Sequence, residues 1–437
     1  MTEVTIGLDI GTTSVKAVAV DGDGVVLRRA RVPHDLHVPA PDMLEHDAVQ
    51  AWRDGPVRAL AQVGTDGARG IAIAAMVPSC TAVDDSGTPL TPGLLYGDRR
   101  GRTGHSTGNP AVTGESRAFL DWTAKAAPEA RGYWPAQAVA SVVLGGPPVV
   151  DLGVAASSYP IFTGVEWDAK ALAEIGLVPE QMPLVAPAGS NAGTIAGLPL
   201  APGSVDALGE QLVAGVEEPG EVLVLCGTTL ITWSVMDAWR EEPGLWSIPH
   251  HIPGRFLVGG PSNAGGLFLN WARRLVGEAP GGVDAARVPV FAPYIRGERT
   301  PLHDPDRRAA LDGLDLTMGA AAVRRAAYEA AGFVVRHHID LGRTDARRIV
   351  ATGGGVQDAG WVQALADCTG LPVDVVAVPE GGALGTAWLA RMAAGLETSI
   401  VDARRWAKVA RTVEPDPAYA PYIDERYARF RALTATP

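Results

Sequence analysis

The sequence of 437 residues contains little cysteine and lysine and no long apolar run. Its three cysteines, Cys80, Cys226 and Cys368, lie far apart, which excludes a disulfide framework and a zinc site built on closely paired cysteines. No stretch of 18 residues is uninterruptedly apolar, and the N-terminal residues lack the basic region of a secretory signal. These absences predict a cytoplasmic protein.

Positive charge is also scarce, because 37 Lys and Arg stand against 49 Asp and Glu and leave a net charge of −12. An acidic chain lacks the basic surface of a nucleic-acid or anionic-membrane binder, so we expect neither partner. Apolar residues make up 47% of the chain and charged residues 20%, which excludes a disordered protein. The length allows about two to four domains and a core large enough for an enzyme.

The signatures of several common nucleotide-binding enzymes are missing as well. No lysine follows a glycine, so the Walker sequence GxxxxGK[ST] does not occur. The HRD and DFG sequences of protein kinases and the GxGxxG of dinucleotide-binding domains are not found either. These absences exclude Walker-type NTPases, protein kinases and Rossmann-type dehydrogenases.

The sequence does contain one strand–loop–strand pattern twice. Residues 4–10 and 15–20 read as strands interrupted by Gly11-Thr12-Thr13, and residues 221–226 and 230–235 read as strands interrupted by Gly227-Thr228-Thr229. The two loops lie 216 residues apart, almost half the chain, which favours a duplicated domain. Chance is the alternative, because Gly-Thr-Thr is a common turn.

The remaining pattern predicts an α/β protein in which strands alternate with helices. A turn at residues 217–220 marks the boundary between two predicted domains, 1–216 and 217–437. The first domain starts with an antiparallel meander over residues 4–27, followed by a helix from residue 47 and a strand at 70–75. In the second domain we expect helices at 318–341, at 358–369, after 381–383 and at the C-terminus, and strands at 348–351 and 373–376.

The Gly-Thr-Thr loops have the chemistry of phosphate-binding loops. Successive backbone N–H groups and two hydroxyls at a tight turn suit phosphate oxygens. Asp9 stands two residues before the first loop, where it could hold Mg²⁺ directly or through water, and Lys16 follows the loop. Two ordinary hairpin turns with a solvated lysine are the alternative. The Gly353-Gly354-Gly355 turn could let adenine or ribose approach the backbone, or could serve only for close helix–sheet packing.

Seven segments, in order, resemble motifs of the FGGY family of carbohydrate kinases, especially its xylulokinase-like members. They are TIGLDIGTTSVKAV, LEHDAVQAW, DDSGTPLTPGLLYGDRRG, AGVEEPGEVLVLCGTTL, FAPYIRGERTPLHDP, VATGGGVQDAGWVQALADCTGLPVDV and GGALGTAWLA. The resemblance implies two actin-like (RNase H-like) domains with an interdomain catalytic cleft. It further implies that ATP and Mg²⁺ lie between the two loops, with adenine toward the glycines at 353–355. The substrate would be a small sugar or polyol, and a homodimer is left open.

The resemblance also assigns roles to individual residues. It implies that Asp206 is the catalytic base, which would take the proton of the attacking sugar hydroxyl, with Glu210 on the same helical face as the alternative. Met76 would contact the sugar. Asn263 would face the sugar or ATP, although a turn asparagine is the preferred interpretation of this residue. Gly265 would lie at the nucleotide.

Two departures from the family pattern leave the substrate open. Residues 193–206 are short and lack the usual glycine-rich lead-in, and Val77 stands where xylulokinase-type members often have a histidine. A ketopentose such as xylulose is the first expectation, ahead of ribulose, a pentitol or another polyol. A sugar- or nucleotide-binding pseudokinase that acts as a sensor, and an actin-like ATPase without a sugar substrate, are the alternatives.

Four conspicuous charged or histidine groups receive a structural interpretation. The adjacent pairs His250-His251 and His337-His338 would diverge on a helix and have no further ligands at zinc spacing, so we expect no metal site. Glu298 and Arg299 are interpreted as a charged pair that stabilises the fold. The Asp98-Arg99-Arg100 cluster is either a solvated turn or part of the sugar-binding region.

Overall fold

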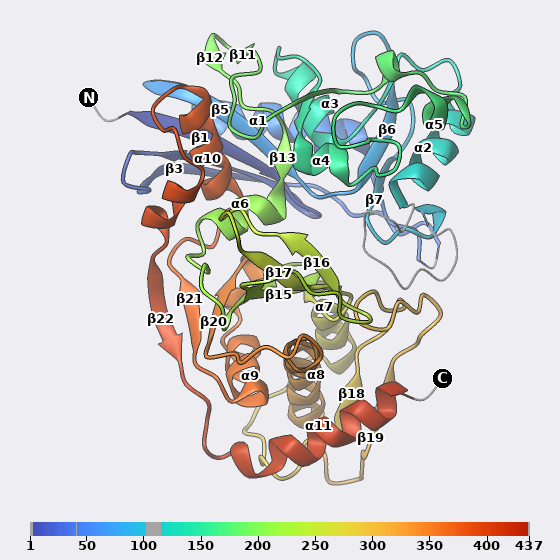
Figure 1. Ribbon diagram of the computed structural model, residues 1–437. Helices are drawn as coiled ribbons and strands as arrows, with labels where there is room; N and C mark the ends of the chain where they lie inside the picture. The colour runs from blue at the N-terminus through green and yellow to red at the C-terminus, as the bar shows by residue number, and fades with distance from the viewer. Residues whose placement is uncertain (1–2, 41, 102–114, 436–437) are drawn as a thin grey trace. The chain divides into compact units, whose positions relative to one another are not determined.

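A computed structural model describes residues 3–40, 42–101 and 115–435 and contains two compact units (Figure 1). Unit 1 comprises Met1–Val213 and Glu380–Trp406, and unit 2 comprises Ala214–Pro379 and Ala407–Pro437. The sequence had suggested one division, at 216/217. The structure differs, because the chain returns to unit 1 at Glu380–Trp406. The helix in this segment packs directly on the first strands of the chain. Among the described helices, none is both long and apolar enough to span a membrane.

The central sheet of unit 1 has the strand order β13-β5-β1-β2-β3. The chain-order neighbours β1 (Val4–Ile10), β2 (Ser14–Val20) and β3 (Val26–Pro33) are antiparallel, which confirms the predicted meander. On the other side of β1, β5 (Ala68–Ala75) runs parallel to it, and β13 (Ser204–Val205) runs parallel to β5. Every residue of β1 is buried, so both faces of the sheet are covered here.

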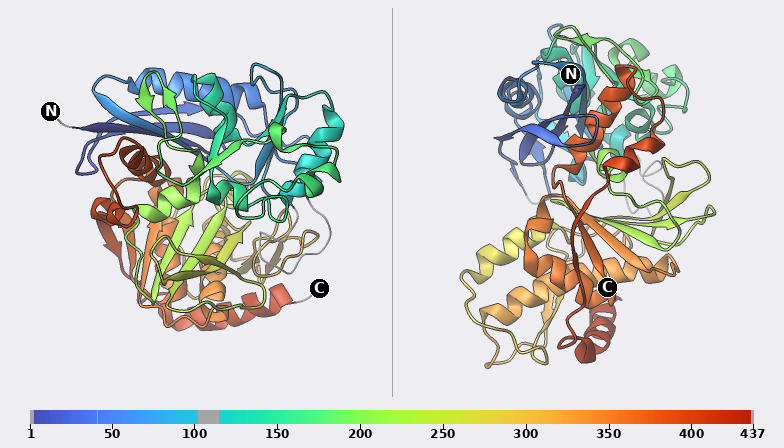
Figure 2. Two further views of the ribbon diagram at one scale, coloured as in Figure 1. Left: turned by 45° about the horizontal axis from the view of Figure 1, so that its top comes forward. Right: turned by 90° about the vertical axis from the view of Figure 1, so that its left-hand side faces the viewer.

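Alternation along β1 divides its side chains between two layers. Ile6, Leu8 and Ile10 join the main hydrophobic core of unit 1, together with Trp52 and Ala59 from the helical segments η1 (Gln50–Asp54) and α1 (Gly55–Val63). The opposite face lies against α10 (Gly381–Ala393), which is coloured red beside the blue strands in Figure 2. There Thr5 donates a hydrogen bond from its hydroxyl to the carbonyl of Ala387, at 3.1 Å.

A second sheet of unit 1, with the order β4-β7-β6-β8, and several short elements complete this unit. Their bounds are β4 (Glu45–His46), β6 (Ser79–Val83), β7 (Gly93–Leu95), η2 (Arg99–Gly101), α2 (Glu115–Ala126), β8 (Gly132–Trp134), α3 (Ala136–Val143), β9 (Val149–Asp151), α4 (Leu152–Ala156), α5 (Ala169–Ala173), η4 (Pro179–Gln181), β10 (Leu184–Ala186), β11 (Thr194–Ile195), β12 (Leu198–Pro199), α6 (Asp206–Leu212) and η6 (Val401–Trp406).

Unit 2 repeats the strand arrangement of unit 1 around the second Gly-Thr-Thr loop. Strands β14 (Glu221–Cys226) and β15 (Leu230–Met236) form the antiparallel hairpin, β17 (Phe256–Ser262) extends it, and β20 (Arg348–Thr352) runs parallel on the other side of β14. The full order is β16-β17-β15-β14-β20-β21-β22. The same hairpin with the same neighbours in both units supports the inference of a duplicated domain.

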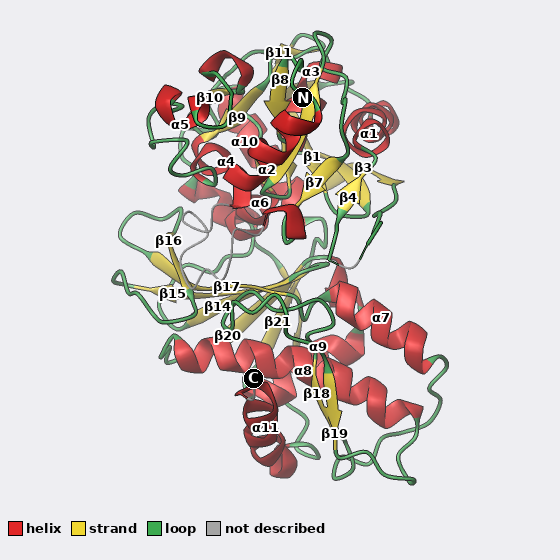
Figure 3. Cartoon of the chain, turned by 90° about the vertical axis from the view of Figure 1, so that its right-hand side faces the viewer, coloured by secondary structure: helices red, strands yellow, loops and turns green. Residues whose placement is uncertain are grey.

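The helices of unit 2 agree closely with the sequence expectation. The helices expected at 318–341 and 358–369 are α8 (Ala320–Leu341) and α9 (Ala359–Thr369), which lie side by side against the sheet (Figure 3). The terminal helix is α11 (Ala420–Ala435). The other elements are β16 (Trp246–Pro249), α7 (Gly266–Val276), β18 (Val290–Ala292), β19 (Ala310–Asp312), η5 (Gly354–Gln357), β21 (Val373–Val376) and β22 (Val409–Val413).

Candidate active site

The first Gly-Thr-Thr loop closes the β1–β2 hairpin of unit 1. Gly11 donates its N–H to the carbonyl of Ser14, at 3.1 Å, so the turn is tight. The hairpin register places Asp9 directly opposite Lys16, and Lys16 Nζ lies 3.3 Å from Asp9 Oδ2. Asp9 is buried, and its negative charge is the main reason why the pKa of Lys16 is raised. The lysine therefore interacts with a carboxylate and is not a freely solvated side chain.

The parallel strands bring Asp206 to the same end of the sheet. Ser204 pairs with Ala74 of β5, Ala74 also pairs with Asp9 of β1, and Asp206 begins α6 directly after β13. The buried amide of Gln137 fixes this arrangement by donating to the carbonyls of Ser204, at 2.9 Å, and of Ala75, at 3.2 Å. Sequence reasoning missed Gln137, since nothing in its neighbourhood along the chain marks it.

Electrostatics link Asp206 to the first loop. Burial, followed by the negative charge of Asp9, raises the pKa of Asp206 to about 7. Glu210, one turn further along α6 and also buried, acts in the same direction, whereas Lys16 opposes it. A carboxyl group with a pKa near neutral pH is suited to general-base chemistry. Asp206 and Glu210 both interact electrostatically with Lys16. Both carboxyl groups therefore belong to one cluster with Asp9 and Lys16, and either could be the base.

Close backbone contacts between α6, α10 and β1 hold this cluster in place. A Cβ atom on Gly382 would lie 3.1 Å from Asp9 Oδ2, and one on Gly209 would lie 2.5 Å from the carbonyl oxygen of Gly382. A Cβ atom on Gly385 would come within 2.0 Å of the carbonyl oxygen of Gly209. Side chains larger than hydrogen would therefore separate the two helices and displace Asp9. The glycines of the segment GGALGTAWLA are the feature of the sequence that could have indicated this contact.

The second Gly-Thr-Thr loop, in unit 2, is held by the first turn of α7. Gly266 donates its N–H to the carbonyl of Gly227, at 2.8 Å, and Leu267 donates to the carbonyl of Thr228, at 3.1 Å. Gly265 packs on the same loop, because a Cβ atom there would lie 2.4 Å from the carbonyl carbon of Thr229. Gly265 therefore lies beside this loop, and its predicted contact with the nucleotide stays a prediction.

Matches to known protein families span both units. The model of the FGGY family of carbohydrate kinases, N-terminal domain, matches residues 4–198, and that of its C-terminal domain matches residues 223–394. The chain belongs to this family. It is therefore a carbohydrate kinase of the two-domain, actin-like α/β fold, which transfers phosphate from ATP to a sugar or polyol.

Individual relatives of this kinase differ in substrate. The chain is 25% identical to xylulose kinase of Escherichia coli (strain K12), over 98% of either chain. It is also 25% identical to gluconokinase of Bacillus subtilis (strain 168), over 90% of this chain and 88% of that protein. The crystal structure of xylulose kinase from Rhodospirillum rubrum is 26% identical and has a TM-score of 0.74, covering 99% of this chain and 98% of that one.

The FGGY signature stretch around Glu298 contacts the second loop of the kinase. The buried carboxylate of Glu298 accepts hydrogen bonds from the Ser262 hydroxyl, at 2.5 Å, and from the backbone N–H groups of Asn263, at 2.8 Å, and Arg299, at 2.6 Å. Burial raises the pKa of Glu298 to about 7. Arg299 donates from Nη2 to the hydroxyl of Thr229, at 3.1 Å. Glu298 thus stabilises the fold, whereas Arg299 contacts a side chain of the second Gly-Thr-Thr loop, a contact that the sequence did not predict.

Two of the predicted substrate contacts have structural partners of their own. The amide of Asn263 donates to the carbonyl of Gly297, at 2.9 Å, as a turn asparagine does. Met76 follows β5, donates its N–H to the carbonyl of Ile10, at 3.4 Å, and buries its side chain in the core of unit 1. Their contact with a sugar stays a prediction.

The three glycines predicted at the adenosine do not share one role in the packing. A Cβ atom on Gly353, which has φ of +89°, would lie 3.0 Å from the carbonyl oxygen of Cys226, and one on Gly355 would lie 2.1 Å from the Trp361 ring. Both positions therefore serve close packing between β14, β20 and the following turn. Gly354 is exposed, and a Cβ atom there would meet no described atom within 4 Å, so this is the member that a flat ligand could approach.

Asp9 is suited to hold a cation in this kinase. Its Oδ1 atom is buried and has no hydrogen-bond partner among the described residues, so it offers a free oxygen ligand. Within residues 3–40, 42–101 and 115–435, no cluster of three or more His, Cys, Asp or Glu could hold a metal ion. Mg²⁺ keeps several waters and binds through one or two carboxylates together with substrate phosphates, which fits a single aspartate.

The remaining charged clusters have structural roles. Asp98 is fully buried and accepts hydrogen bonds from the N–H of Leu44, at 2.5 Å, and from the guanidinium of Arg100, so the interpretation as a solvated turn was wrong. Arg100 also pairs with Glu45, at 2.8 Å. His250 accepts the N–H of Ile252 at Nδ1 and contacts the carbonyl of Val216 through Nε2.

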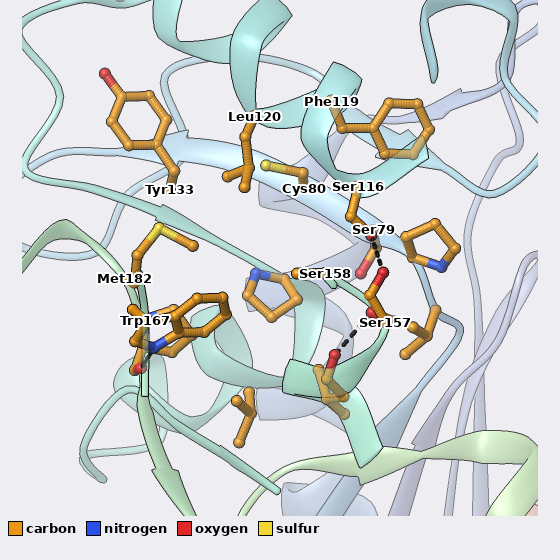
Figure 4. A pocket seen from close by; sticks show the side chains of 16 residues that line it. Ser79, Cys80, Ser116, Phe119, Leu120, Tyr133, Ser157, Ser158, Trp167 and Met182 are labelled. Carbon is orange, nitrogen blue, oxygen red and sulfur yellow. Dashed lines mark hydrogen bonds between the residues drawn. The ribbon is translucent and has the colours of Figure 1, made fainter. Parts of the chain in front are cut away.

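A small cavity of about 30 Å³ lies in unit 1, next to Val77 and Pro78 (Figure 4). Its lining is mainly apolar, and the hydroxyls of three lining serines have partners within the protein. Ser79 accepts the N–H of Ala136, and Ser116 and Ser157 donate to the backbone. The volume has room for little more than water. Neither predicted sugar contact of unit 1, at 76 or 206, lines it.

Proposed function

We propose that this kinase phosphorylates a hydroxyl of a neutral ketose or polyol, with a ketopentose such as xylulose as the first candidate. The observation that carries the proposal is the cluster of Asp9, Lys16 and Asp206 at one end of the unit 1 sheet. It combines a cation, a carboxylate suited to a metal ion and a carboxyl group with a pKa near 7, beside a loop with the chemistry of phosphate binding.

In this proposal Asp206 is the catalytic base. Its carboxylate accepts the proton of the acceptor hydroxyl while the oxygen forms its bond to the γ-phosphorus of ATP and the bond to the β-phosphate oxygen breaks. Sugar phosphate and ADP are the products. Glu210 remains the alternative base, since it belongs to the same electrostatic cluster.

The other residues hold the donor. Backbone N–H groups and hydroxyls of residues 11–13 and 227–229 would bind phosphate oxygens, with Lys16 and Arg299 supplying positive charge. Asp9 would hold Mg²⁺, which neutralises charge on the phosphates when it is bound. Gly354 would allow the adenosine to approach the backbone.

The charge of the cluster favours a neutral acceptor over a sugar acid. Asp9, Asp206 and Glu210 all interact with Lys16, so the carboxylate of an acid such as gluconate would enter a site that already holds three carboxyl groups and would add like charge. Val77 stands where xylulokinase-type members often have a histidine, and its side chain cannot form a hydrogen bond to a sugar hydroxyl. We therefore expect other residues to distinguish the hydroxyl positions of neutral substrates.

The test is an ADP-release screen with ketopentoses, pentitols, hexuloses, glycerol and sugar acids, with ³¹P NMR to identify the product. We expect the highest kcat/KM with a ketopentose and little turnover of sugar acids. Highest activity with gluconate would contradict the choice of substrate. ATP hydrolysis at full rate without an acceptor would favour the actin-like ATPase, and nucleotide binding without any transfer would favour the sensor.

A further inference from the structure

Two side chains contact Thr12, the central residue of the first loop: that of His46, which is buried, and that of Tyr96, which is partly buried. His46 Nε2 lies 2.8 Å from the carbonyl oxygen of Thr12, and the hydroxyl of Tyr96 lies 2.9 Å from the hydroxyl of Thr12. These side chains come from neighbouring strands, since His46 of β4 pairs with Gly93 of β7 and Tyr96 follows β7. The loop is thus held at the carbonyl and at the hydroxyl of one residue.

Trp52 determines which nitrogen of His46 carries the proton. The indole Nε1 lies 3.0 Å from His46 Nδ1, and an indole nitrogen can only donate. Nδ1 must therefore be the acceptor, so that a neutral ring has its proton on Nε2 and donates it to the Thr12 carbonyl. Both side chains are fully buried, and burial lowers the pKa of His46 to about 3, which keeps the ring neutral.

The tryptophan has little freedom to leave this position. A Cβ atom on Gly93 would lie 2.4 Å from the Trp52 ring, so the ring packs directly on the backbone of β7. The ring of His34 completes the group in an edge contact with His46 at 4.5 Å, and the backbone N–H of His34 donates to the carbonyl of Thr13, at 3.1 Å. The loop backbone is therefore anchored to the interior at two successive carbonyls.

Peptide geometry connects this anchor to phosphate binding. A trans peptide is planar, so the carbonyl of Thr12 and the N–H of Thr13 point in opposite directions. When His46 draws the carbonyl toward the interior, the N–H of Thr13 points away from it, and Thr13 is an exposed residue of the loop. We propose that His46, held in its Nε2–H tautomer by Trp52, is a positioning residue that aims the first loop at ATP. This inference rests on the proposed function of that loop.

The test compares His46→Leu, His46→Gln and Trp52→Phe with the wild-type kinase. Leucine removes the donor, and we expect the KM for ATP to rise about tenfold, with less than a twofold change in the KM for the acceptor. Glutamine can place an amide N–H near the position of Nε2 and should restore most of the affinity. Trp52→Phe keeps an aromatic ring without the donor, so an intermediate rise is expected.

His250 of unit 2 provides a matched control. It is also buried, with the same pattern of an N–H donated to Nδ1 and a carbonyl facing Nε2, but it belongs to neither loop. His250→Leu should leave the KM for ATP unchanged. If His46→Leu is folded by circular dichroism and keeps the wild-type KM for ATP, or if both leucine variants raise it equally, the positioning role is wrong.

A measurement without turnover separates this inference from the proposed function. In ¹⁵N-histidine NMR of the wild-type protein we expect the proton of His46 on Nε2, and in Trp52→Phe a mixture of the two tautomers. Calorimetric binding of ADP should weaken in His46→Leu. If no acceptor is phosphorylated but these results hold, only the proposed substrate fails; a proton on Nδ1 in the wild type would overturn the inference itself.

Discussion

Asp206→Asn should inactivate the kinase and at the same time stabilise it above pH 7. The wild-type carboxyl group is half-buried near Asp9 and Glu210, and its pKa is raised from 3.8 to about 7, chiefly by burial. Asparagine keeps the shape and removes the charge. Loss of a general base commonly costs about 100-fold or more in rate, so activity and stability should change in opposite directions.

The pH dependence of the stability follows from where the proton binds. In the folded protein Asp206 keeps its proton up to about pH 7, whereas in the unfolded chain it loses it near pH 4. Between these values the folded state binds more protons, so the free energy of unfolding of the wild type falls as the pH rises, and it levels off above about pH 7. Asparagine does not titrate and removes this decline.

The size of the effect can be worked out from the same pKa values. The difference between 3.8 and about 7 corresponds to about 4 kcal/mol. Because water still reaches the half-buried side chain, screening should reduce this to about 2 kcal/mol. Asp206→Asn should therefore unfold at a temperature a few degrees higher than the wild type at pH 8, and the difference should shrink toward pH 4.5.

The assay is thermal unfolding of both proteins from pH 4.5 to 8.5, in EDTA and without nucleotide, beside kcat/KM over the same range. The kcat/KM of the wild type should rise with pH through about 7, as the base loses its proton. Glu210→Gln is the control and should retain most of the activity. An active Asp206→Asn with an inactive Glu210→Gln would reverse the assignment, and an unchanged melting temperature at pH 8 would refute the electrostatic reasoning.

Three further outcomes are expected. Gly385→Ala should lower the melting temperature and the activity, because its Cβ atom would lie 2.0 Å from the carbonyl oxygen of Gly209 and overpacking costs about 1–3 kcal/mol; an unchanged melting curve would contradict this. Arg299→Lys should raise the KM for ATP several-fold while the exposed control Arg287→Lys does not, because lysine lacks the planar donor that reaches Thr229. EDTA should abolish turnover and Mg²⁺ should restore it. Neither should change the melting temperature of the nucleotide-free kinase by more than about 1 °C, because no described cluster of His, Cys, Asp and Glu could hold a metal ion on its own.

Local patterns were sufficient to predict much of the fold. Apolar residues at period two in 4–10 and an apolar run at 221–226, each followed by Gly-Thr-Thr, located both hairpins, and the structure confirms them as β1–β2 and β14–β15. The helical period located α8 and α9 to within two residues. These features depend on neighbours along the chain, which is the information that periodicity contains.

The contacts that organise the candidate site could not be predicted in this way. Gln137, His46 and Trp52 each act on groups that local sequence does not connect to them, and no local pattern distinguishes them from ordinary core residues. Asp98 looked like part of a charged surface turn because its neighbours are arginines, yet its carboxylate is buried against the N–H of Leu44. Burial and long-range hydrogen bonding are properties of the packed fold.

The assignment of Glu380–Trp406 to unit 1 shows the same limit with a greater functional consequence. The glycines of α10 were visible in the sequence as part of a family motif, but their purpose depends on what they touch. Gly382 packs against the Asp9 carboxylate and against α6, the helix that begins with Asp206. A contact between residues 373 positions apart in the sequence, Gly382 and Asp9, therefore helps to determine where two site carboxylates lie.

The charge of this cluster is the basis of two of our expectations, a cation that accompanies ATP and a neutral acceptor. Asp9, Asp206 and Glu210 all interact with Lys16, so three carboxyl groups lie close together before any phosphate arrives. A triphosphate beside them adds negative charge, and like charges at short range in a partly buried site repel strongly. The Oδ1 atom of Asp9, which has no partner among the described residues, offers a ligand for a divalent ion that would offset this repulsion. A neutral sugar would add no charge, which is the reason that we propose a neutral acceptor and not a sugar acid.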